Sequence, residues 1–288
     1  MHSTRDLHRR IRSISNTAQI TKAMQMVAAS KMRKAQQAAL GGRPFVNLLY
    51  RIQREATSRM GIFSHPLLEK RNVRKRAVIL VGADKGLCGA LNTNLFRVAA
   101  QFEPQSTVFI TAGHKASQYI ARIGRQLAAE FAYTETPHFS EAAAIAAFAR
   151  DLFLKGEVDQ VQVVATRFVN TLAQNPLATE FLPVGEIKAL KIPGMESEEE
   201  LAADNIESLF EPNPETVLGY LLSHYLNIYI YQVLLNAEAS EQSARMVSMK
   251  NATDSAERLI KDLSLEYNKR RQDNITKELL EIAGGQSA

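Results

Sequence analysis

The sequence predicts the fold class α/β with long helices: an antiparallel, left-handed two-helix coiled coil of the N- and C-terminal helices plus a small Rossmann-like parallel α/β domain. Both ends of the 288-residue chain have almost no Gly or Pro, and their apolar and small residues recur at steps of three and four. Between them, short apolar runs rich in Val and Ile alternate with helical patterns, which favours a layered domain. We therefore expect domains at residues 1–60, 61–210 and 211–288.

The N-terminal segment is expected to be one long, interrupted helix over residues 4–57. No Gly or Pro occurs from Thr4 to Leu40, and the residues are good helix formers. The sequence Gly41-Gly42-Arg43-Pro44 should kink or break the helix, because proline removes a backbone donor and glycine adds chain entropy. The alternative is two short helices joined by a loop.

The C-terminal segment shows the same pattern over residues 213–283, where Gly219 is the single glycine and no proline follows Pro214. At about 1.5 Å per residue this helix would be roughly 105 Å long, and the N-terminal one roughly 80 Å. Helices of that length cannot be enclosed in a compact domain, so we expect them to pair with each other. A seam period near 3.5 residues predicts left-handed coiling.

The middle of the chain predicts a parallel α/β layer. Strands are expected at residues 76–83, 107–111 and 158–168, and helices at 91–102, 115–123 and 140–155. Alternation of this kind produces a parallel sheet with right-handed crossovers. Residues 185–210, which include Glu198-Glu199-Glu200, are expected to form a surface connection to the C-terminal helix.

Residues 82–89 follow the first strand, where a nucleotide-binding turn would lie. Lys85 precedes Gly86 and no Ser or Thr follows, so the phosphate-loop spacing is absent. Of the three glycines of a dinucleotide fingerprint, only Gly86 and Gly89 are present. A tight strand-to-helix turn is therefore favoured, with Cys88 as a buried small hydrophobe. Because no His or carboxylate spacing matches a triad or a metal site, we expect no catalytic residue, no cofactor and no metal.

Other general features exclude several classes of protein. A single cysteine excludes an intramolecular disulfide and indicates a reducing compartment. No run approaches the ~18 apolar residues of a membrane span, and the charged start is not that of a secretory signal, so the chain is expected neither to span a membrane nor to be secreted. Residues 1–60 contain 12 Lys and Arg against two Asp and Glu. This basic segment could face nucleic acid, water or an acidic protein surface, and composition leaves all three open.

Four segments resemble one known family. Residues 11–35, with the run TKAMQMVAASKMRKA, and residues 84–89, DKGLCG, are similar to the gamma subunit of rotary proton-translocating ATP synthases, the central stalk. So are residues 238–254 and 267–282. The resemblance spans both ends and the start of the middle domain. One departure is Gly89-Ala90, where the family usually has paired glycines.

The resemblance implies a mechanical function. The chain would be the central rotor shaft of the ATP synthase soluble head, coupling transmembrane proton flow through the membrane rotor ring to ATP synthesis or hydrolysis in the alpha/beta hexamer. It would be a non-catalytic subunit, since the family's catalytic sites lie in the beta subunits. A coiled-coil interaction scaffold without a rotary role is the alternative, and an α/β-domain enzyme that requires nucleotide is a third hypothesis.

The resemblance also implies partners and a location. The partners are the alpha and beta subunits of the hexamer, the epsilon subunit and the membrane rotor ring subunits, with no nucleic acid. The location is peripheral, on the cytoplasmic side of the bacterial inner (cell) membrane. The residues that match family contacts with the hexamer are Lys22, Met24, Arg245, Arg271, Gln272 and Thr276.

Overall fold

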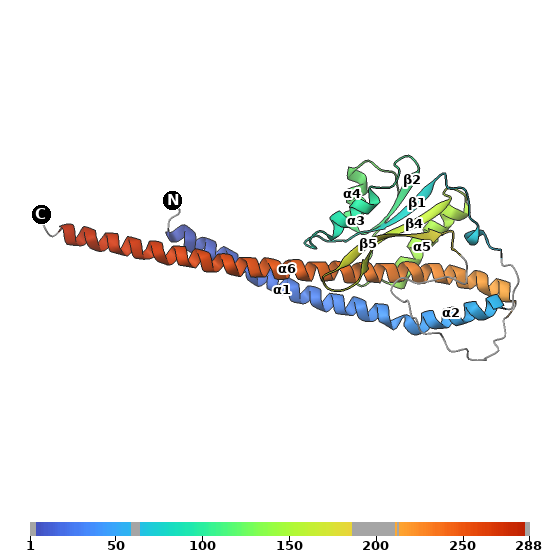
Figure 1. Ribbon diagram of the computed structural model, residues 1–288, viewed down its shortest axis with the longest axis horizontal. Coiled ribbons are helices and arrows are strands. Elements are labelled where there is room, and N and C mark those ends of the chain that lie inside the picture. Colours follow the sequence, from blue (N-terminus) through green and yellow to red (C-terminus); the bar gives the residue numbers. More distant parts are fainter. Residues whose placement is uncertain (1–3, 59–63, 186–210, 212, 286–288) are drawn as a thin grey trace. The chain divides into compact units, whose positions relative to one another are not determined.

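The computed structural model describes residues 4–58, 64–185, 211 and 213–285 (Figure 1). The chain divides into two compact units. The first consists of Met1–Ala28 and Arg245–Ala288, and the second of Ala29–Ala244. Helices α1 (Thr4–Gly41) and α6 (Pro214–Gly285) each contribute residues to both units. The predicted division at residues 60 and 210 stays a prediction.

The first unit is an antiparallel pair of helices. Thr21 of α1 meets Thr253 of α6 through a 2.7 Å hydrogen bond between their hydroxyls, and the rings of His8 and Tyr267 lie 5.9 Å apart. A step toward the N-terminus of α1 is thus matched by a step toward the C-terminus of α6, which confirms the predicted pairing of the terminal helices. Small residues in the seam allow close approach of the two backbones. The buried seam residues are Leu7, Ala18, Thr21, Ala28, Met249, Thr253 and Ala256.

The interruption of the N-terminal helix is confirmed. Helix α1 ends at Gly41, and α2 (Arg43–Ser58) begins after the single intervening residue Gly42. The first bond of α2 runs from the Val46 amide to the Gly42 carbonyl, at 3.1 Å. Pro44 lies in the first turn of α2, where backbone N–H groups have no intrahelical acceptor, so the N–H that proline lacks is not needed.

The second unit contains a five-stranded sheet in the order β3-β2-β1-β4-β5 (Figure 1). Neighbours β3/β2, β2/β1 and β1/β4 are parallel, and β5 is antiparallel to β4. The strands are β1 (Arg76–Val81), β2 (Thr107–Ala112), β3 (Leu127–Phe131), β4 (Gln160–Phe168) and β5 (Gln174–Leu182).

The α/β fold class is confirmed, but the sheet is mixed and larger than predicted. The predicted strands correspond to β1, β2 and β4, while β3 and β5 were missed. Both lie at the sheet edges, where burial is incomplete and the apolar pattern is weak: β3 contains two alanines and β5 contains Pro176. Proline is tolerated at an edge because no ladder bond is needed on the outer side.

Helices cover both faces of the sheet. Alternate residues of β1 separate two cores, with Val78 and Leu80 on one face and Ile79 and Val81 on the other, as expected for a strand buried on both sides. Helices α3 (Leu91–Ala99) and α4 (His114–Arg122) pack on the first face. Helix α5 (Phe139–Leu154), the first part of α6 and residues of α2 pack on the second.

The remaining observations concern the connections to the sheet and the prediction about a membrane span. The short 3-10 helix η1 (Pro66–Leu68) precedes β1, and the Val184 amide after β5 bonds to the carbonyl of its residue Leu67 at 2.8 Å. The predicted surface connection over 185–210 lies outside the described residues except for Gly185. Among the helices of the described residues, none is both long enough and apolar enough to cross a membrane.

Candidate partner-binding surface

The turn after β1 is a packing element, as predicted. The Gly82 amide bonds to the Ala112 carbonyl at 2.9 Å, and a side chain at Gly82 would place its Cβ 2.9 Å from the Ala116 Cβ. Cys88 is only 3% exposed, which confirms its predicted burial. Within the described part of the chain, no three His, Cys, Asp or Glu side chains group together as metal ligands would. Gly82 thus allows close packing of the end of β1 against α4, whereas a side chain at Gly86 would meet open space.

The six residues that match family contacts all belong to the first unit. Lys22 is exposed and Met24 half-buried on α1, whereas Arg245 on α6 is only 7% exposed. Arg271, Gln272 and Thr276 are exposed near the end of α6. The structure therefore distributes these residues along two helices and does not gather them into one site.

The C-terminal part of α6, which contains Arg271, Gln272 and Thr276, also exposes large apolar side chains. All residues from 271 to 280 are exposed, including the large apolar side chains of Ile275, Leu279 and Leu280. Their spacing places Ile275 and Leu279 on the same side of the helix. The Thr276 hydroxyl donates to the Gln272 carbonyl at 2.9 Å, so its oxygen retains acceptor capacity for a partner. Exposed apolar side chains at helical spacing indicate a docking surface.

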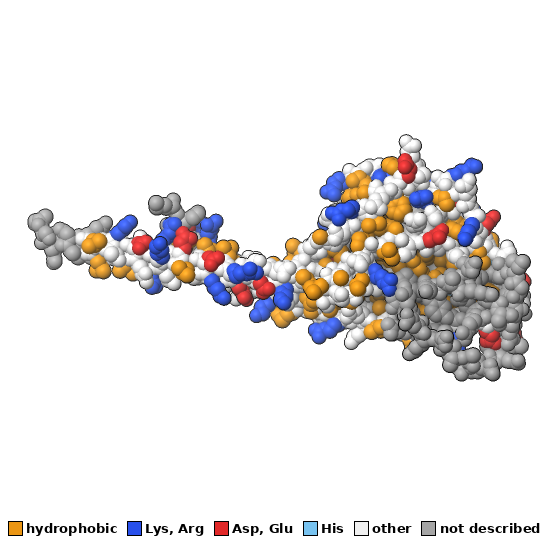
Figure 2. All heavy atoms as spheres, in the orientation of Figure 1, with side chains coloured by type: hydrophobic (Ala, Val, Ile, Leu, Met, Phe, Trp, Pro, Cys, Tyr) orange, Lys and Arg blue, Asp and Glu red, His pale blue; other side chains and the backbone are white. Residues whose placement is uncertain are grey.

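The charges of the first unit are interspersed. On the face visible in Figure 2, Lys and Arg side chains (blue) alternate with Asp and Glu (red) and with hydrophobic side chains (orange) along α1 and α6. One local pair is Arg270 with Glu266, at 2.8 Å. A continuous phosphate-binding stripe would require an uninterrupted basic face. The mixed charge on this face therefore favours contacts with protein over contacts with nucleic acid.

The Thr21–Thr253 pair supplies a polar contact inside an otherwise apolar seam. Besides the 2.7 Å bond between them, each hydroxyl also has a carbonyl of its own helix within reach, Ala18 for Thr21 at 3.1 Å and Met249 for Thr253 at 2.9 Å. Each hydroxyl has one proton, so one threonine donates across the seam while the other donates within its helix. A buried polar pair of this kind specifies the register of two helices.

Replacing one of the two threonines with valine should destabilise the chain, and replacing both should restore most of the loss. Thr21→Val leaves the Thr253 hydroxyl without its cross-seam partner, at a cost of about 1 kcal/mol, whereas two valines remove both polar groups from the seam. Urea unfolding of the single and double variants measures this, with the exposed Thr17→Val as the control. Additive losses in the double variant would contradict the coupling.

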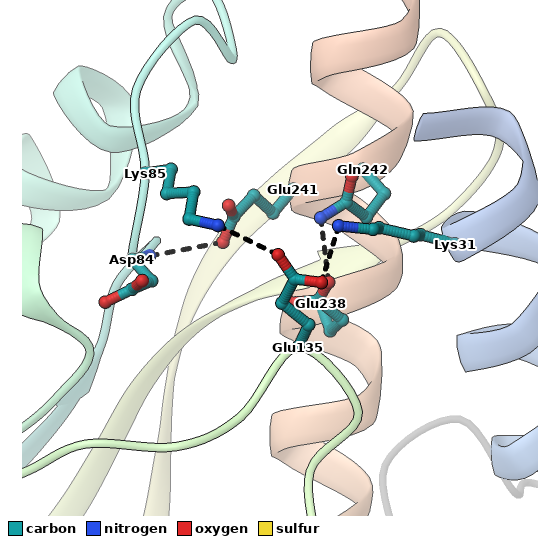
Figure 3. A network of polar contacts seen from close by, with 7 residues as sticks. All are labelled: Lys31, Asp84, Lys85, Glu135, Glu238, Glu241 and Gln242. Atoms are coloured by element: carbon teal, nitrogen blue, oxygen red, sulfur yellow. Dashed lines mark hydrogen bonds and ion pairs between the residues drawn. The ribbon is translucent and has the colours of Figure 1, made fainter. Parts of the chain in front are cut away.

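A second polar cluster lies in the second unit, close to the residues where α1 and α6 enter it (Figure 3). The Glu135 carboxylate, in the loop between β3 and α5, pairs with Lys31 of α1 at 2.5 Å and with Lys85 of the β1–α3 turn at 2.8 Å. The Asp84 amide donates to the Glu241 carboxylate of α6 at 3.3 Å. The hydrogen bonds and charges of Lys31 and Lys85 lower the pKa of Glu135 from 4.5 to about 2.

The depressed pKa of Glu135 predicts a contribution to stability that depends on pH. A carboxyl whose folded pKa lies near 2 stabilises the fold fully above its unfolded pKa of about 4.5, and this contribution is lost as the pH falls toward 2. Because the side chain is 51% exposed, we expect no more than about 1 kcal/mol. The unfolding free energies of the wild type and Glu135→Gln should therefore converge between pH 6 and about pH 3 in urea titrations. A constant difference across this range would contradict the assignment.

One unit is an antiparallel pair of terminal helices with an exposed end, the other is a mixed α/β domain, and the candidate site is a contact surface on the helices. The family model for ATP synthase matches residues 3–288. The ATP synthase gamma chains of Opitutus terrae and Methylacidiphilum infernorum are each 44% identical, over 100% of this chain and 99% of theirs. The chain therefore belongs to the ATP synthase gamma chain family.

Solved structures share the fold. A chain of the Euglena gracilis mitochondrial ATP synthase, in an OSCP/F1/c-ring structure, superposes with a TM-score of 0.68 at 20% identity, covering 99% of this chain and 94% of that one. A chain of the central stalk/c-ring structure of the Tetrahymena thermophila mitochondrial ATP synthase gives a TM-score of 0.57 at 25% identity, covering 81% and 99%. The Euglena likeness concerns the fold alone.

Proposed function

We propose that this chain is the central rotor shaft of an ATP synthase soluble head. It couples proton flow through the membrane rotor ring to ATP synthesis or hydrolysis in the alpha/beta hexamer. The observation that carries the proposal is the antiparallel pairing of the terminal helices, anchored by Thr21 and Thr253, in a chain that matches gamma chains over its full length. A paired-helix element resists bending and twisting more than a single helix, as transmission of torque requires.

The subunit itself is proposed to be non-catalytic and to need no cofactor. Its contribution is a difference in contact free energy between the shaft and the partner conformations around it. Residues 1–60 and 211–288 would form the shaft, and residues 61–210 the α/β domain. The alpha and beta subunits would surround the helices, while the epsilon subunit and the rotor ring would contact the chain elsewhere. The complex would place the chain peripherally at the cytoplasmic side of the bacterial cell membrane.

Reconstitution tests the proposal directly. The chain is combined with alpha and beta subunits, and ATP hydrolysis is compared with that of the chain alone and of the hexamer alone. We expect no hydrolysis by the isolated chain and cooperative hydrolysis by the assembled head. Failure to bind the hexamer would favour a scaffold of another kind, and nucleotide binding by the isolated chain would favour an enzyme.

The proposed contacts with the hexamer are Lys22, Met24, Arg245, Arg271, Gln272 and Thr276. Exposed members can bond to acidic or polar groups of a partner by charge-assisted hydrogen bonds. Arg245 differs from them because it is buried in the chain. A partner group would therefore have to approach the helix closely to contact its side chain.

Met24→Lys should impair energy coupling more than folding. Met24 is half-buried, and an ammonium there must be desolvated at each contact with the surrounding subunits. A cost of about 1–2 kcal/mol in one angular position slows the affected step roughly five- to thirtyfold. Proton pumping per ATP hydrolysed is the measurement, and Gln19→Lys adds the same charge at an exposed position of the same helix. Equal loss of assembly and coupling would count against this account.

A further inference from the structure

Glu135 joins two segments that are distant along the chain. Lys31 of α1 is 104 residues away and Lys85 of the β1–α3 turn is 50 residues away, yet both ammonium groups contact its carboxylate, one at each oxygen. Figure 3 shows the two lysine side chains reaching Glu135 from opposite sides. The carboxylate therefore acts as a bridge between a helix of the shaft and the α/β domain.

The β1–α3 turn, which contains Lys85, is also hydrogen-bonded to α6. Asp84 directly precedes Lys85, and its backbone amide donates to the Glu241 carboxylate at 3.3 Å. Glu241 is buried, as is Glu238, whose carboxylate accepts a 2.8 Å hydrogen bond from Gln242. The turn is thus hydrogen-bonded to α6 through Asp84 and linked to α1 through Lys85 and Glu135 (Figure 3).

Helix α6 has additional attachments to the domain. The Ser240 hydroxyl lies 3.3 Å from the Thr166 carbonyl of β4, and the Ser243 hydroxyl donates to the Thr171 carbonyl at 3.0 Å. Lys31 provides an attachment of this kind for α1. The Lys31–Glu135 contact therefore gives α1 a polar attachment of its own to the domain, in addition to its pairing with α6.

Stability of the fold does not explain the bridge. Glu135 and Lys85 are 51% and 65% exposed, and exposed ion pairs contribute little to the free energy of folding. Short, charge-assisted hydrogen bonds do, however, fix the distance and direction between the groups they join. A bridge with little effect on stability and a strong effect on relative position is suited to resisting displacement of α1 against the domain.

We propose that Glu135 is a positioning residue that transmits torque between the α/β domain and helix α1. The inference rests on the proposed rotor function and adds to it a route by which the domain drives the N-terminal helix. Lys31 is the essential partner in this route, and Lys85 holds the carboxylate in place. None of these residues belongs to the proposed contacts with the hexamer.

The test uses the complete ATP synthase complex in sealed vesicles, with ATP hydrolysis and ATP-driven proton pumping measured together. Glu135→Gln should lower the number of protons pumped per ATP hydrolysed at least threefold. Glu103→Gln, which removes the same charge from an exposed loop position, should leave it unchanged. Equal coupling in the two variants would overturn the proposal. A wild-type complex that does not pump would instead contradict the rotor function itself.

A double-variant cycle separates the bridge from a general structural effect. Lys31→Gln should reproduce the loss, Lys31→Arg should retain coupling, and Lys31→Gln with Glu135→Gln should be no worse than Glu135→Gln alone. Additive losses would overturn the proposal, as would a loss of stability in Glu135→Gln larger than an exposed ion pair accounts for. If Glu135→Gln fails to assemble, Lys31→Gln and Lys85→Gln decide, and normal coupling in both overturns the bridge.

Discussion

Gly113→Ala is expected to destabilise the chain by about 3 kcal/mol or more. Gly113 lies between β2 and α4 with a φ of +94°, and an added Cβ would meet the Gly82 carbonyl oxygen at 2.2 Å and the Tyr133 ring at 3.3 Å. The surrounding backbone cannot yield easily, because the Gly113 amide bonds to the Phe131 carbonyl at 3.0 Å and the Gly82 amide bonds to Ala112 at 2.9 Å. Urea unfolding of the full chain measures the loss.

Gly124→Ala is the matched control for this substitution. Gly124 also has a positive φ, +64°, but an added Cβ would have open space around it. The control isolates the cost of the left-handed backbone, about 1–2 kcal/mol. If both variants lose the same free energy of unfolding, close packing at Gly113 makes no separate contribution.

Gln232→Met is expected to stabilise the chain by about 1–3 kcal/mol. Gln232 of α6 is 1% exposed, and among the described residues neither its side-chain nitrogen nor its oxygen has a hydrogen-bond partner. Burying an amide without partners costs free energy, whereas methionine fills a similar volume without that cost. A higher urea midpoint with an unchanged slope would establish the gain.

Gln242→Met provides the opposite case on the same helix. Gln242 is also buried, but its amide donates to the Glu238 carboxylate at 2.8 Å. Methionine there removes a donor from a buried carboxylate, so this variant should be less stable than the wild type. A loss of stability in Gln232→Met comparable to that in Gln242→Met would mean that the Gln232 amide is satisfied in the folded chain.

The long helices were predictable because their signals are local. Helix α6 was predicted over 213–283 and extends over Pro214–Gly285, and the break after Gly41 follows from glycine and proline in adjacent turns. Periodicity at steps of three and four also predicted that the two helices pair. The resemblance of the terminal segments to gamma subunits indicates the family from the sequence alone.

The edge strands and the Glu135 bridge could not be predicted in this way. Strand β3 has an exposed pattern without Val or Ile, and β5 is recognisable only through its pairing with β4. Glu135 lies in an ordinary loop sequence, and nothing near it in the chain indicates Lys31 or Lys85. Likewise, the burial of Arg245 depends on what packs around α6.

The amino-acid sequence by itself determined the two helices, their pairing, the parallel core strands and the family, because periodicity, backbone propensity and family motifs are encoded within short segments. Tertiary structure alone decided the mixed sheet, the Thr21–Thr253 register and the attachment of α1 through Glu135. The mixed sheet depends on the pairing of the edge strands β3 and β5 with their neighbours. The Thr21–Thr253 register and the Lys31–Glu135 contact join side chains 232 and 104 residues apart in the chain, and contacts at that separation exist only once the chain has folded.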